Sequence, residues 1–203
     1  YKIYQQKLID LNSCDFGDLI LHTVKILENY PDIRQIYTSN FKYILVDEYQ
    51  DTNRAQFEFL TCLAKAHENI CVVGDDDQSI YGWRGADVTN ILDFEKTFSS
   101  CRVFTLEKNY RSTQEILNAA TAVVMNNDKR TNKTLVAANG SGETLGLIET
   151  IDEQEEASAI VSSIEKEIKL NKRTFNKFAV LYRTNAQSRA LEESFIRQGI
   201  PYN

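Results

Sequence analysis

The sequence has few of the residues that mark secreted, metal-binding or membrane proteins. Its four cysteines show no CxxC spacing, and only two histidines accompany them. This pattern argues against a zinc site and indicates reduced thiols in the cytoplasm. No apolar run approaches the roughly 18 residues that a membrane helix needs, and the first residues lack the pattern of a signal peptide. With two prolines and eight glycines in 203 residues, we expect a regularly structured α/β chain.

A phosphate-binding loop is also absent. No stretch matches GxxxxGK followed by Ser or Thr, the pattern whose backbone N–H groups cradle the phosphates of a nucleotide. The first residues, "YKIYQQKLIDLN", do not include an initiator methionine. The missing methionine indicates that the chain is cut from a longer protein.

The net charge of −6 argues mildly against a nucleic-acid partner, but the distribution of charge weakens that objection. Residues 1–108 carry 17 acidic and 11 basic residues, a net charge of −6, whereas residues 109–203 carry 12 of each. Six of the acidic residues lie at the ends of two apolar runs, where a site could use them: Asp47, Glu48, Asp51, Asp75, Asp76 and Asp77.

Apolar runs alternate with helical patterns along the chain, which indicates a βαβ architecture. Most runs are continuous, as in parallel strands that are buried on both faces. We expect strands at 41–48, 69–75, 101–107, 144–150 and 177–183. We expect helices at 15–30, 53–67, 112–127, 155–170 and 185–199. Capping residues are expected at Thr52 or Asn53, Ser112 and Asn185, with Gly199 at the end of the last helix.

The first strand candidate, within "YILVDEYQDTN" (43–53), delivers Asp47 and Glu48 at its carboxyl end. In open α/β sheets ligands bind at that edge, and Mg²⁺ takes oxygen ligands while it keeps several waters. Asp47 is predicted to hold Mg²⁺ through water, and Glu48 to orient or deprotonate an attacking water. The alternative is that the pair only ends a strand and caps the following helix.

The second strand candidate, "ICVVGD", also ends in an acid, Asp75. Gly74 is expected to let the backbone turn sharply under a ligand. Gln78 is a neutral side chain that can donate and accept, and it suits a bridge between a phosphate oxygen and a water. The alternative for Gln78 is an exposed loop amide. Asp76 and Asp77 either serve the site or only shape the loop.

Two groups of aromatic and basic residues follow. Tyr81, Trp83 and Arg84 lie in a loop rich in Gly and Asp, where a tryptophan beside an arginine can stack on an unpaired base and hold a phosphate. The alternative is a core tryptophan with an arginine across it. Tyr110 and Arg111 precede a helix, where they can offer a flat face to a base and a bidentate contact to a phosphate. Such a pair is also common in surface turns.

Taken together, "LVDEYQDTN", "VVGDDDQSIYGWRGAD", "LEKNYRST" and "VLYRTNAQSRALEE" resemble superfamily 1 DNA helicases of the UvrD/Rep/PcrA type. The resemblance extends over nearly the whole chain, because "DFGDLI" is similar to a further family segment. It implies parallel-sheet RecA-like motor domains of the P-loop NTPase type, both incomplete. Residues 1–108 would be the C-terminal part of motor domain 1A, the ATP-binding domain, and 109–203 the N-terminal part of domain 2A.

The resemblance also implies roles for individual residues. Three would be catalytic: Glu48 as the base of ATP hydrolysis, Gln78 as the sensor of the γ-phosphate and Arg111 as the arginine finger. Further nucleotide contacts would come from Asp47 through Mg²⁺, from Asp75 at the strand end, and from Tyr110 stacked on adenine. DNA contacts would come from Trp83, stacked on an unpaired base, and from Tyr81, Arg84, Arg183 and Asn185.

The implied activity is that of an ATP-dependent DNA helicase in repair or replication, with ATP and Mg²⁺ as cofactors. Its partners would be single-stranded DNA and single/double-strand junctions, its movement 3′ to 5′, and its location the bacterial cytosol or nucleoid. Because the P-loop is absent, the chain alone is predicted to be inactive. Two alternatives stay open: a helicase-nuclease subunit of the recombination type, and a non-catalytic interaction module that keeps the fold.

Overall fold

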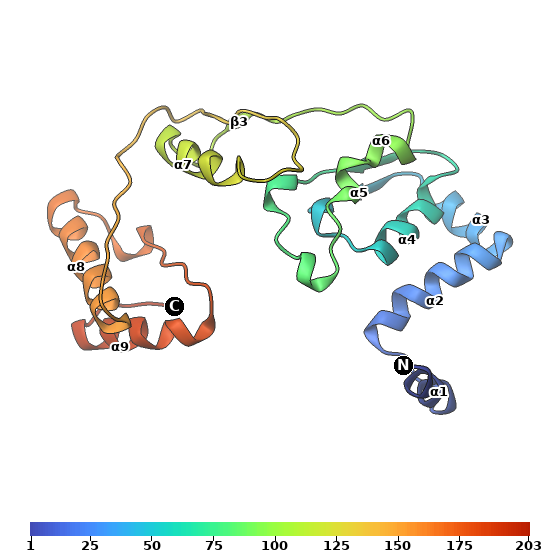
Figure 1. Ribbon diagram of the computed structural model, residues 1–203, viewed down its shortest axis with the longest axis horizontal. Coiled ribbons are helices and arrows are strands. Elements are labelled where there is room, and N and C mark those ends of the chain that lie inside the picture. The colour runs from blue at the N-terminus through green and yellow to red at the C-terminus, as the bar shows by residue number, and fades with distance from the viewer. The chain divides into compact units, whose positions relative to one another are not determined.

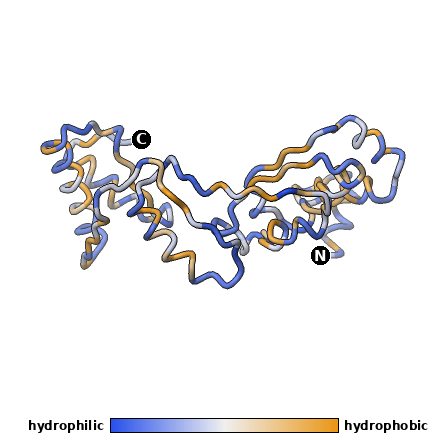
Figure 2. Tube along the Cα trace, turned by 90° about the horizontal axis from the view of Figure 1, so that it is seen from above, coloured by the Kyte–Doolittle hydropathy of each residue, from blue (hydrophilic) through white to orange (hydrophobic).

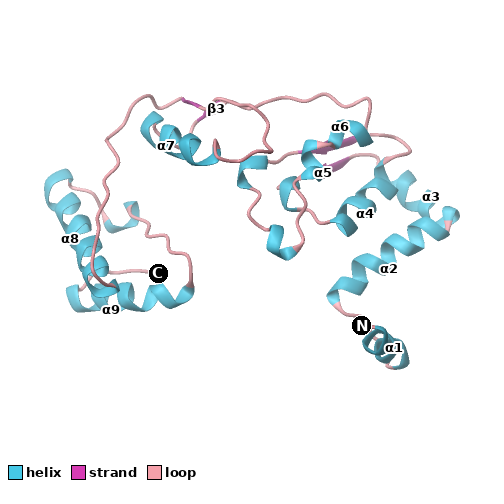
Figure 3. Ribbon diagram, in the orientation of Figure 1, coloured by secondary structure: helices cyan, strands magenta, loops and turns pink.

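Short strands and helices make up the structure, a computed structural model that describes residues 1–203 (Figures 1 and 3). By packing, the chain divides into two units, Tyr1–Gly142 and Glu143–Asn203. The first unit contains α1 (Lys2–Asp10), α2 (Phe16–Asn29), α3 (Pro31–Asn40), β1 (Ile44–Val46), α4 (Arg54–Ala64), β2 (Ile70–Val72), α5 (Thr89–Leu92), α6 (Phe94–Thr97), β3 (Lys108–Asn109), α7 (Gln114–Val124) and β4 (Val136–Ala137). The second contains α8 (Glu153–Asn171) and α9 (Ser188–Gln198).

Five short 3₁₀ helices complete the elements. Three of them lie in the loops that carry the sequence motifs, and two lie in the second unit. They are η1 (Tyr49–Asp51), η2 (Asp76–Gln78), η3 (Gly82–Arg84), η4 (Phe175–Lys177) and η5 (Asn185–Gln187). None of the helices is both long and apolar enough to cross a membrane.

Strands β1 and β2 are parallel neighbours, as the sequence predicts. Ile44 is paired with Ile70 and Val46 with Val72. The pairing continues past the strands, because the N–H of Tyr49 donates to the carbonyl of Val73 at 3.0 Å. In a parallel pair the carboxyl ends meet at one edge, so the two acid-bearing turns lie close together.

Only one face of this strand pair is covered, which corrects the prediction of strands buried on both faces. Ile44, Val46, Ile70 and Val72 pack against a core from α4 to α6 and the neighbouring turns, whose buried members are Tyr49, Ala64, Phe94 and Phe98. The alternate residues face away from this core, and Leu45 is 79% exposed. The apolar composition of the run predicted burial, but the helices lie against a single face.

Three predicted strands are wrong in this structure: 101–107, 144–150 and 177–183 have no strand assignment. Their apolar side chains are largely exposed, and Phe104, Leu147 and Leu181 are 79%, 86% and 93% accessible. Figure 2 shows hydrophobic residues on extended segments as well as on helices. A strand needs a neighbour that shares its backbone hydrogen bonds along its length, and in the run 101–107 only the last residue, Glu107, accepts one, from the N–H of Val136 at 2.9 Å. The short pair β3 and β4 forms instead, with Lys108 opposite Val136.

The predicted helices are present, with small differences at their ends. Asn53 caps α4 in a reciprocal box, since its side chain accepts from the N–H of Gln56 at 3.0 Å and Gln56 bonds back. Ser112 is not a cap, because α7 begins later and Thr113 holds that position. Gly199 ends α9 in the left-handed region, at φ +67°.

The second unit is built on the contact between α8 and α9. Its buried residues repeat at helical spacing on the facing sides of the two helices and continue into the last residues of the chain. They are Ala157, Val161, Ile164, Ala190, Leu191, Phe195 and Ile200. Phe178 and Val180, from one of the runs predicted as a strand, are half-buried and pack against this core.

Candidate functional site

The carboxyl end of β1 carries Asp47 and Glu48, both exposed. Glu48 lies in the left-handed region at φ +50° and ψ +42°, an uncommon conformation for a residue with a side chain. Its N–H donates to Oδ1 of Asp47 at 3.0 Å. The chain therefore turns at Glu48 directly after the strand, and both carboxylates remain accessible to a ligand.

Gln50 joins the two strand ends, a role that the sequence analysis missed. Its Nε2 donates to Oε2 of Glu48 at 2.9 Å, and its Oε1 accepts the N–H of Asp75 at 3.0 Å. Gln50 is 1% exposed, so both bonds start from a side chain inside the protein. The position of Gln50 two residues after Glu48 is the signal that could have identified it.

Gly74 is required by close packing and not by a turn under a ligand, which corrects the sequence-based explanation. It is not among the residues with positive φ. A Cβ at this position would lie 2.6 Å from Oε1 of Gln50 and 2.8 Å from Cδ1 of Ile91. Glycine therefore leaves the space that the buried Gln50 amide occupies.

The three aspartates after β2 are paired with two cations from the segment after α7. Arg130 binds Asp77 bidentately, with both N–O distances at 2.9 Å. The ammonium of Lys133 contacts all three carboxylates, at 3.0 Å from Asp76, 3.1 Å from Asp77 and in a short contact with Asp75. We name these five residues the ion-pair cluster. Asp76 and Asp77 therefore shape the loop, one of the two roles left open by the sequence.

The ion-pair cluster is shielded, and its contacts favour the charged forms of Asp75, Asp77 and Lys133. The Arg130 and Lys133 side chains are 13% and 11% exposed. The hydrogen bond from Arg130 lowers the pKa of Asp77, and Lys133 lowers it further. Burial would raise the pKa of Asp75, but hydrogen bonds from Lys133 and Gln78 bring it below its ordinary value. Burial would lower the pKa of Lys133, yet its three carboxylate partners raise it overall.

Gln78 ends η2 with an exposed side chain that is already oriented. Its Nε2 donates to Oδ2 of Asp75 at 2.8 Å, and its backbone N–H donates to the carbonyl of Asp75 at 2.9 Å. Ser79, the next residue, donates from its hydroxyl to the carbonyl of Gln50 at 3.3 Å. The Gln78 amide thus lies within one turn of the residues that join β1 to β2.

Tyr81, Trp83 and Arg84 form an exposed aromatic and basic group around η3. The guanidinium carbon of Arg84 lies 4.5 Å from the centroid of the Trp83 ring and 4.9 Å from that of Tyr81. Trp83 is 71% exposed, which excludes the alternative of a core tryptophan. A flat, accessible ring beside a cation can stack on a base and contact a phosphate.

Tyr110 and Arg111 lie in the turn between β3 and α7. Asn109 shapes this turn, because its Oδ1 accepts the N–H groups of Arg111 at 2.9 Å and Ser112 at 2.8 Å. Tyr110 is 71% exposed and has the ammonium of Lys108 5.4 Å from its ring centroid. Both predicted side chains are therefore available to a ligand.

Arg183 and Asn185 lie in the second unit, at the start of η5. Oε1 of Gln187 accepts the N–H groups of Arg183 at 3.0 Å and Thr184 at 2.9 Å. This side chain holds the turn in shape, and Arg183 and Asn185 are exposed on it.

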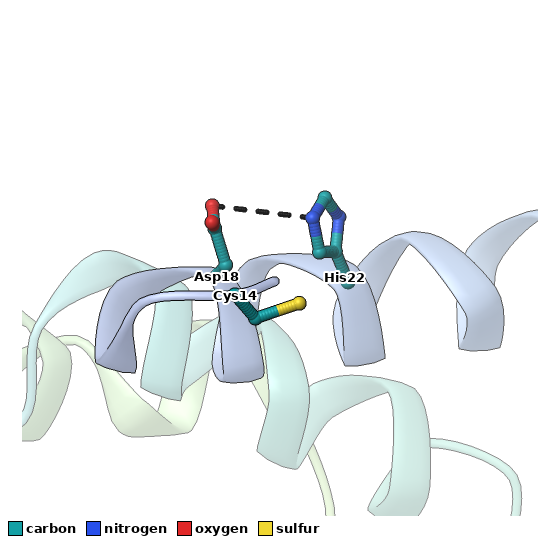
Figure 4. Close-up of side chains that lie close together, drawn as sticks. All are labelled: Cys14, Asp18 and His22. Atoms are coloured by element: carbon teal, nitrogen blue, oxygen red, sulfur yellow. Dashed lines mark ion pairs between the residues drawn. The ribbon is translucent and has the colours of Figure 1, made fainter. Parts of the chain in front are cut away.

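Cys14, Asp18 and His22 lie close together at the start of α2, with ligand atoms within 4.8 Å of one another (Figure 4). Asp18 is 2% exposed, and its carboxylate accepts from the N–H of Asp15 and from Gln5, both at 3.3 Å. Asp15 and Asp18 form the capping box of α2. The capping box and the hydrogen bond from Gln5 therefore explain why the Asp18 carboxylate is buried at the start of α2.

Two family models match the chain. The model of the UvrD/REP helicase N-terminal domain matches residues 1–99, and the model of the UvrD-like helicase C-terminal domain matches residues 104–203. Between them they leave unmatched only the four residues from 100 to 103.

Curated relatives align with the whole chain. ATP-dependent DNA helicase PcrA of Staphylococcus epidermidis is 48% identical over 202 residues, which are 100% of this chain and 28% of that protein. The protein of the same name from Staphylococcus aureus gives the same identity and coverage. The chain thus spans 28% of the length of these relatives. With both family models matched in order, the chain belongs to the UvrD/Rep family of helicases.

Proposed function

We propose that this chain is part of an ATP-dependent DNA helicase, which couples ATP hydrolysis to translocation on single-stranded DNA and to duplex unwinding. The observation that carries the proposal is the link through Gln50 between Glu48 and Asp75. It brings the acid-bearing ends of two parallel strands into one hydrogen-bonded group at the edge where α/β folds bind ligands. The family and the printed names of the relatives support the same activity.

The proposed nucleotide site takes ATP and Mg²⁺. Asp47 fits a cation that keeps its waters, because its carboxylate is exposed and only its Oδ1 is engaged, by the N–H of Glu48. When bound, Mg²⁺ would neutralise charge on the phosphates. Glu48 accepts a proton from the attacking water, and the Gln50 amide holds that carboxylate in place.

The remaining proposed nucleotide contacts come from both sides of the motif loops. Gln78 presents its amide to the γ-phosphate, and Asp75 holds that amide from the strand end. Tyr110 offers its exposed ring to adenine, and Arg111 offers its guanidinium to the γ-phosphate. Glu48, Gln78 and Arg111 are the proposed catalytic residues.

The proposed DNA surface in the first unit consists of Tyr81, Trp83 and Arg84. Single-strand binding by stacking needs rings that are exposed and cations that are near them, and this group has both. Arg183 and Asn185 are the proposed contacts from the second unit. Single-stranded DNA and its junctions with duplex are the proposed partners.

Coupling between the two sites follows from their closeness along the chain. Gln78 and Trp83 are separated by a single short loop, and the N–H of Arg84 donates to the carbonyl of Tyr81 at 2.8 Å in the turn that carries Trp83. A small displacement of Gln78 when the γ-phosphate leaves would therefore move the stacking surface.

The wider assignments are part of the same proposal. The two matched regions would belong to RecA-like motor domains, with the boundary between 1A and 2A at 108/109. Movement would be 3′ to 5′, in DNA repair or replication, in the bacterial cytosol or nucleoid. These assignments are inferred from membership of the family and concern the whole protein of which this chain is a part.

The test is ATP hydrolysis by the full-length protein with and without single-stranded DNA. We expect Glu48→Gln to abolish the DNA-stimulated rate, whereas Glu28→Gln, on an exposed position of α2, leaves it unchanged. The 203-residue chain alone is expected to show no DNA-stimulated hydrolysis. An active Glu48→Gln protein would refute the assignment of the base.

A further inference from the structure

The ion-pair cluster concentrates opposite charges that lie far apart in the sequence. Three consecutive carboxylates repel one another, and at 7% and 8% exposure the Asp76 and Asp77 side chains have little water to screen them. Arg130 and Lys133 come from 53 to 58 residues later. The backbone N–H of Thr131 also donates to Asp76, so the segment 130–133 is fixed by main chain as well as side chains.

The cluster connects the two regions that the family models match separately. Asp75 to Asp77 lie within the match to the N-terminal domain, residues 1–99, whereas Arg130 and Lys133 lie within the match to the C-terminal domain, residues 104–203. In the structure all five residues belong to the same packed unit, Tyr1–Gly142. The loop that carries Gln78 is therefore bonded to a segment of the other matched region.

A continuous set of hydrogen bonds runs from this segment to Gln78. Lys133 donates to Oδ1 of Asp75, and Gln78 donates to Oδ2 of the same carboxylate at 2.8 Å. Arg130 fixes Asp77, whose own N–H donates to Oδ1 of Asp75 at 3.1 Å. Without the two cations, Asp75 would lose the partner that opposes its repulsion from Asp76 and Asp77.

We propose that Arg130 and Lys133 are positioning residues for Gln78: they hold the turn from Asp75 to Gln78 and so fix the direction of the Gln78 amide. That this orientation matters for contact with the γ-phosphate of ATP rests on the proposed function. A second consequence is mechanical, because the Gln78 amide can leave the segment 130–133 only by breaking its hydrogen bond to Asp75, the carboxylate that Lys133 holds. Both residues act through Asp75 and Asp77 and touch no reacting atom.

The direct test uses the 203-residue chain and nuclear magnetic resonance. In Lys133→Met and Arg130→Met, which keep the aliphatic stem and remove the charge, we expect the backbone N–H of Gln78 to exchange with solvent about tenfold faster. The side-chain NH₂ signals of Gln78 should also shift. Lys133→Arg should restore most of the protection, because it returns a cation to the three carboxylates.

Lys169→Met is the matched control, since it removes an ammonium from an exposed pair with Glu165 in the second unit. Unchanged Gln78 exchange and NH₂ signals in both cluster variants, relative to this control, would overturn the proposal. If either variant fails to fold, carboxyl titration of the unmodified chain decides. Titration of Asp77 below the ordinary range supports the ion pair with Arg130, and titration within that range refutes it.

Kinetics of the full-length protein separate this proposal from the proposed function. We expect Lys133→Met to lower the kcat of DNA-stimulated ATP hydrolysis about tenfold with little change in KM, because it displaces a group that acts late in the reaction. An unchanged kcat in Gln78→Ala would refute the role of Gln78 in hydrolysis. The exchange measurement would still decide whether Arg130 and Lys133 position it.

Discussion

Gln50 donates its side-chain amide to Oε2 of Glu48 at 2.9 Å, so a buried side chain holds a residue that is itself exposed. The oxygen of the same amide accepts the N–H of Asp75, so one buried side chain sets the position of both strand ends. A catalytic base needs such a support, because its carboxylate must keep a fixed orientation and still be accessible to the water that it deprotonates.

Replacement of Gln50 should destabilise the fold. Gln50→Ala leaves the half-buried N–H of Asp75 without its acceptor and empties the space of a buried side chain, and we expect the free energy of unfolding to fall by about 1–3 kcal/mol. Urea denaturation of the 203-residue chain measures this change. Gln35→Ala, at an exposed position of α3, is the control and should stay within about 0.5 kcal/mol of the unmodified chain. Equal stability of the two variants would contradict the role of Gln50.

Gly74→Ala should also destabilise the first unit, because the new Cβ would overlap the Gln50 amide and the Ile91 side chain. We expect a loss of about 1–3 kcal/mol in the free energy of unfolding, the usual cost of overpacking. Gly146→Ala is the matched control, since a Cβ there meets no atom within 4 Å. Denaturation curves that coincide for the two variants would show that the space beside Gly74 is not limiting.

Trp83→Ala should weaken the binding of single-stranded DNA. Loss of one stacked base corresponds to about 1–3 kcal/mol of binding free energy, which is roughly 5-fold to 150-fold in the dissociation constant. Fluorescence anisotropy of a labelled oligothymidine measures the dissociation constant. Phe16→Ala, which removes another exposed aromatic ring, is the control. Trp83 is the single tryptophan of the chain, so its own emission should be quenched when DNA binds. Unquenched emission at saturating DNA would exclude stacking.

Acid should weaken the ion-pair cluster. The pKa values of Asp75 and Asp77 are lower in the folded chain than their ordinary values. At a pH between the folded and the unfolded pKa of each carboxyl, the unfolded chain binds more protons than the folded chain. The free energy of unfolding therefore decreases as pH falls below about 4. Lys133 has a raised pKa, and its contribution is lost only at strongly alkaline pH. Urea denaturation at pH 7 and pH 3.5 should show a smaller acid loss in Asp77→Asn than in the unmodified chain.

The helices could be predicted from the sequence to a greater extent than the strands. The pattern of α4, with Asn53 as its cap, is local: the residues that predict the helix lie within it or next to it, and no distant part of the chain is needed. Helix α1 was not predicted, and it buries none of its residues. The runs at 101–107 and 144–150 show the opposite case, because an apolar composition indicates a preference for strand but does not supply the partner.

The candidate site divides in the same way. Asp47 and Glu48 stand directly after β1, the position that the sequence predicts, and both are exposed there. The cations that pair with Asp75, Asp76 and Asp77 could not be assigned, because nothing local connects the aspartates with residues more than 50 positions later. Three adjacent carboxylates do signal a need for counter-charges, but the sequence analysis did not identify "DKRTNK" (128–133) as their source.

The parallel register of β1 and β2 decides what happens when the two strands pair out of alignment during folding. With Val46 opposite Val72, the apolar side chains face the core and the Gln50 amide reaches the N–H of Asp75. A slip by one residue would turn the packed set outward and move that N–H out of reach at the same time. A pair misaligned by one residue therefore loses the packing of its core face and the Gln50 contact together, so burial of this face and alignment of the two acidic turns depend on the same register.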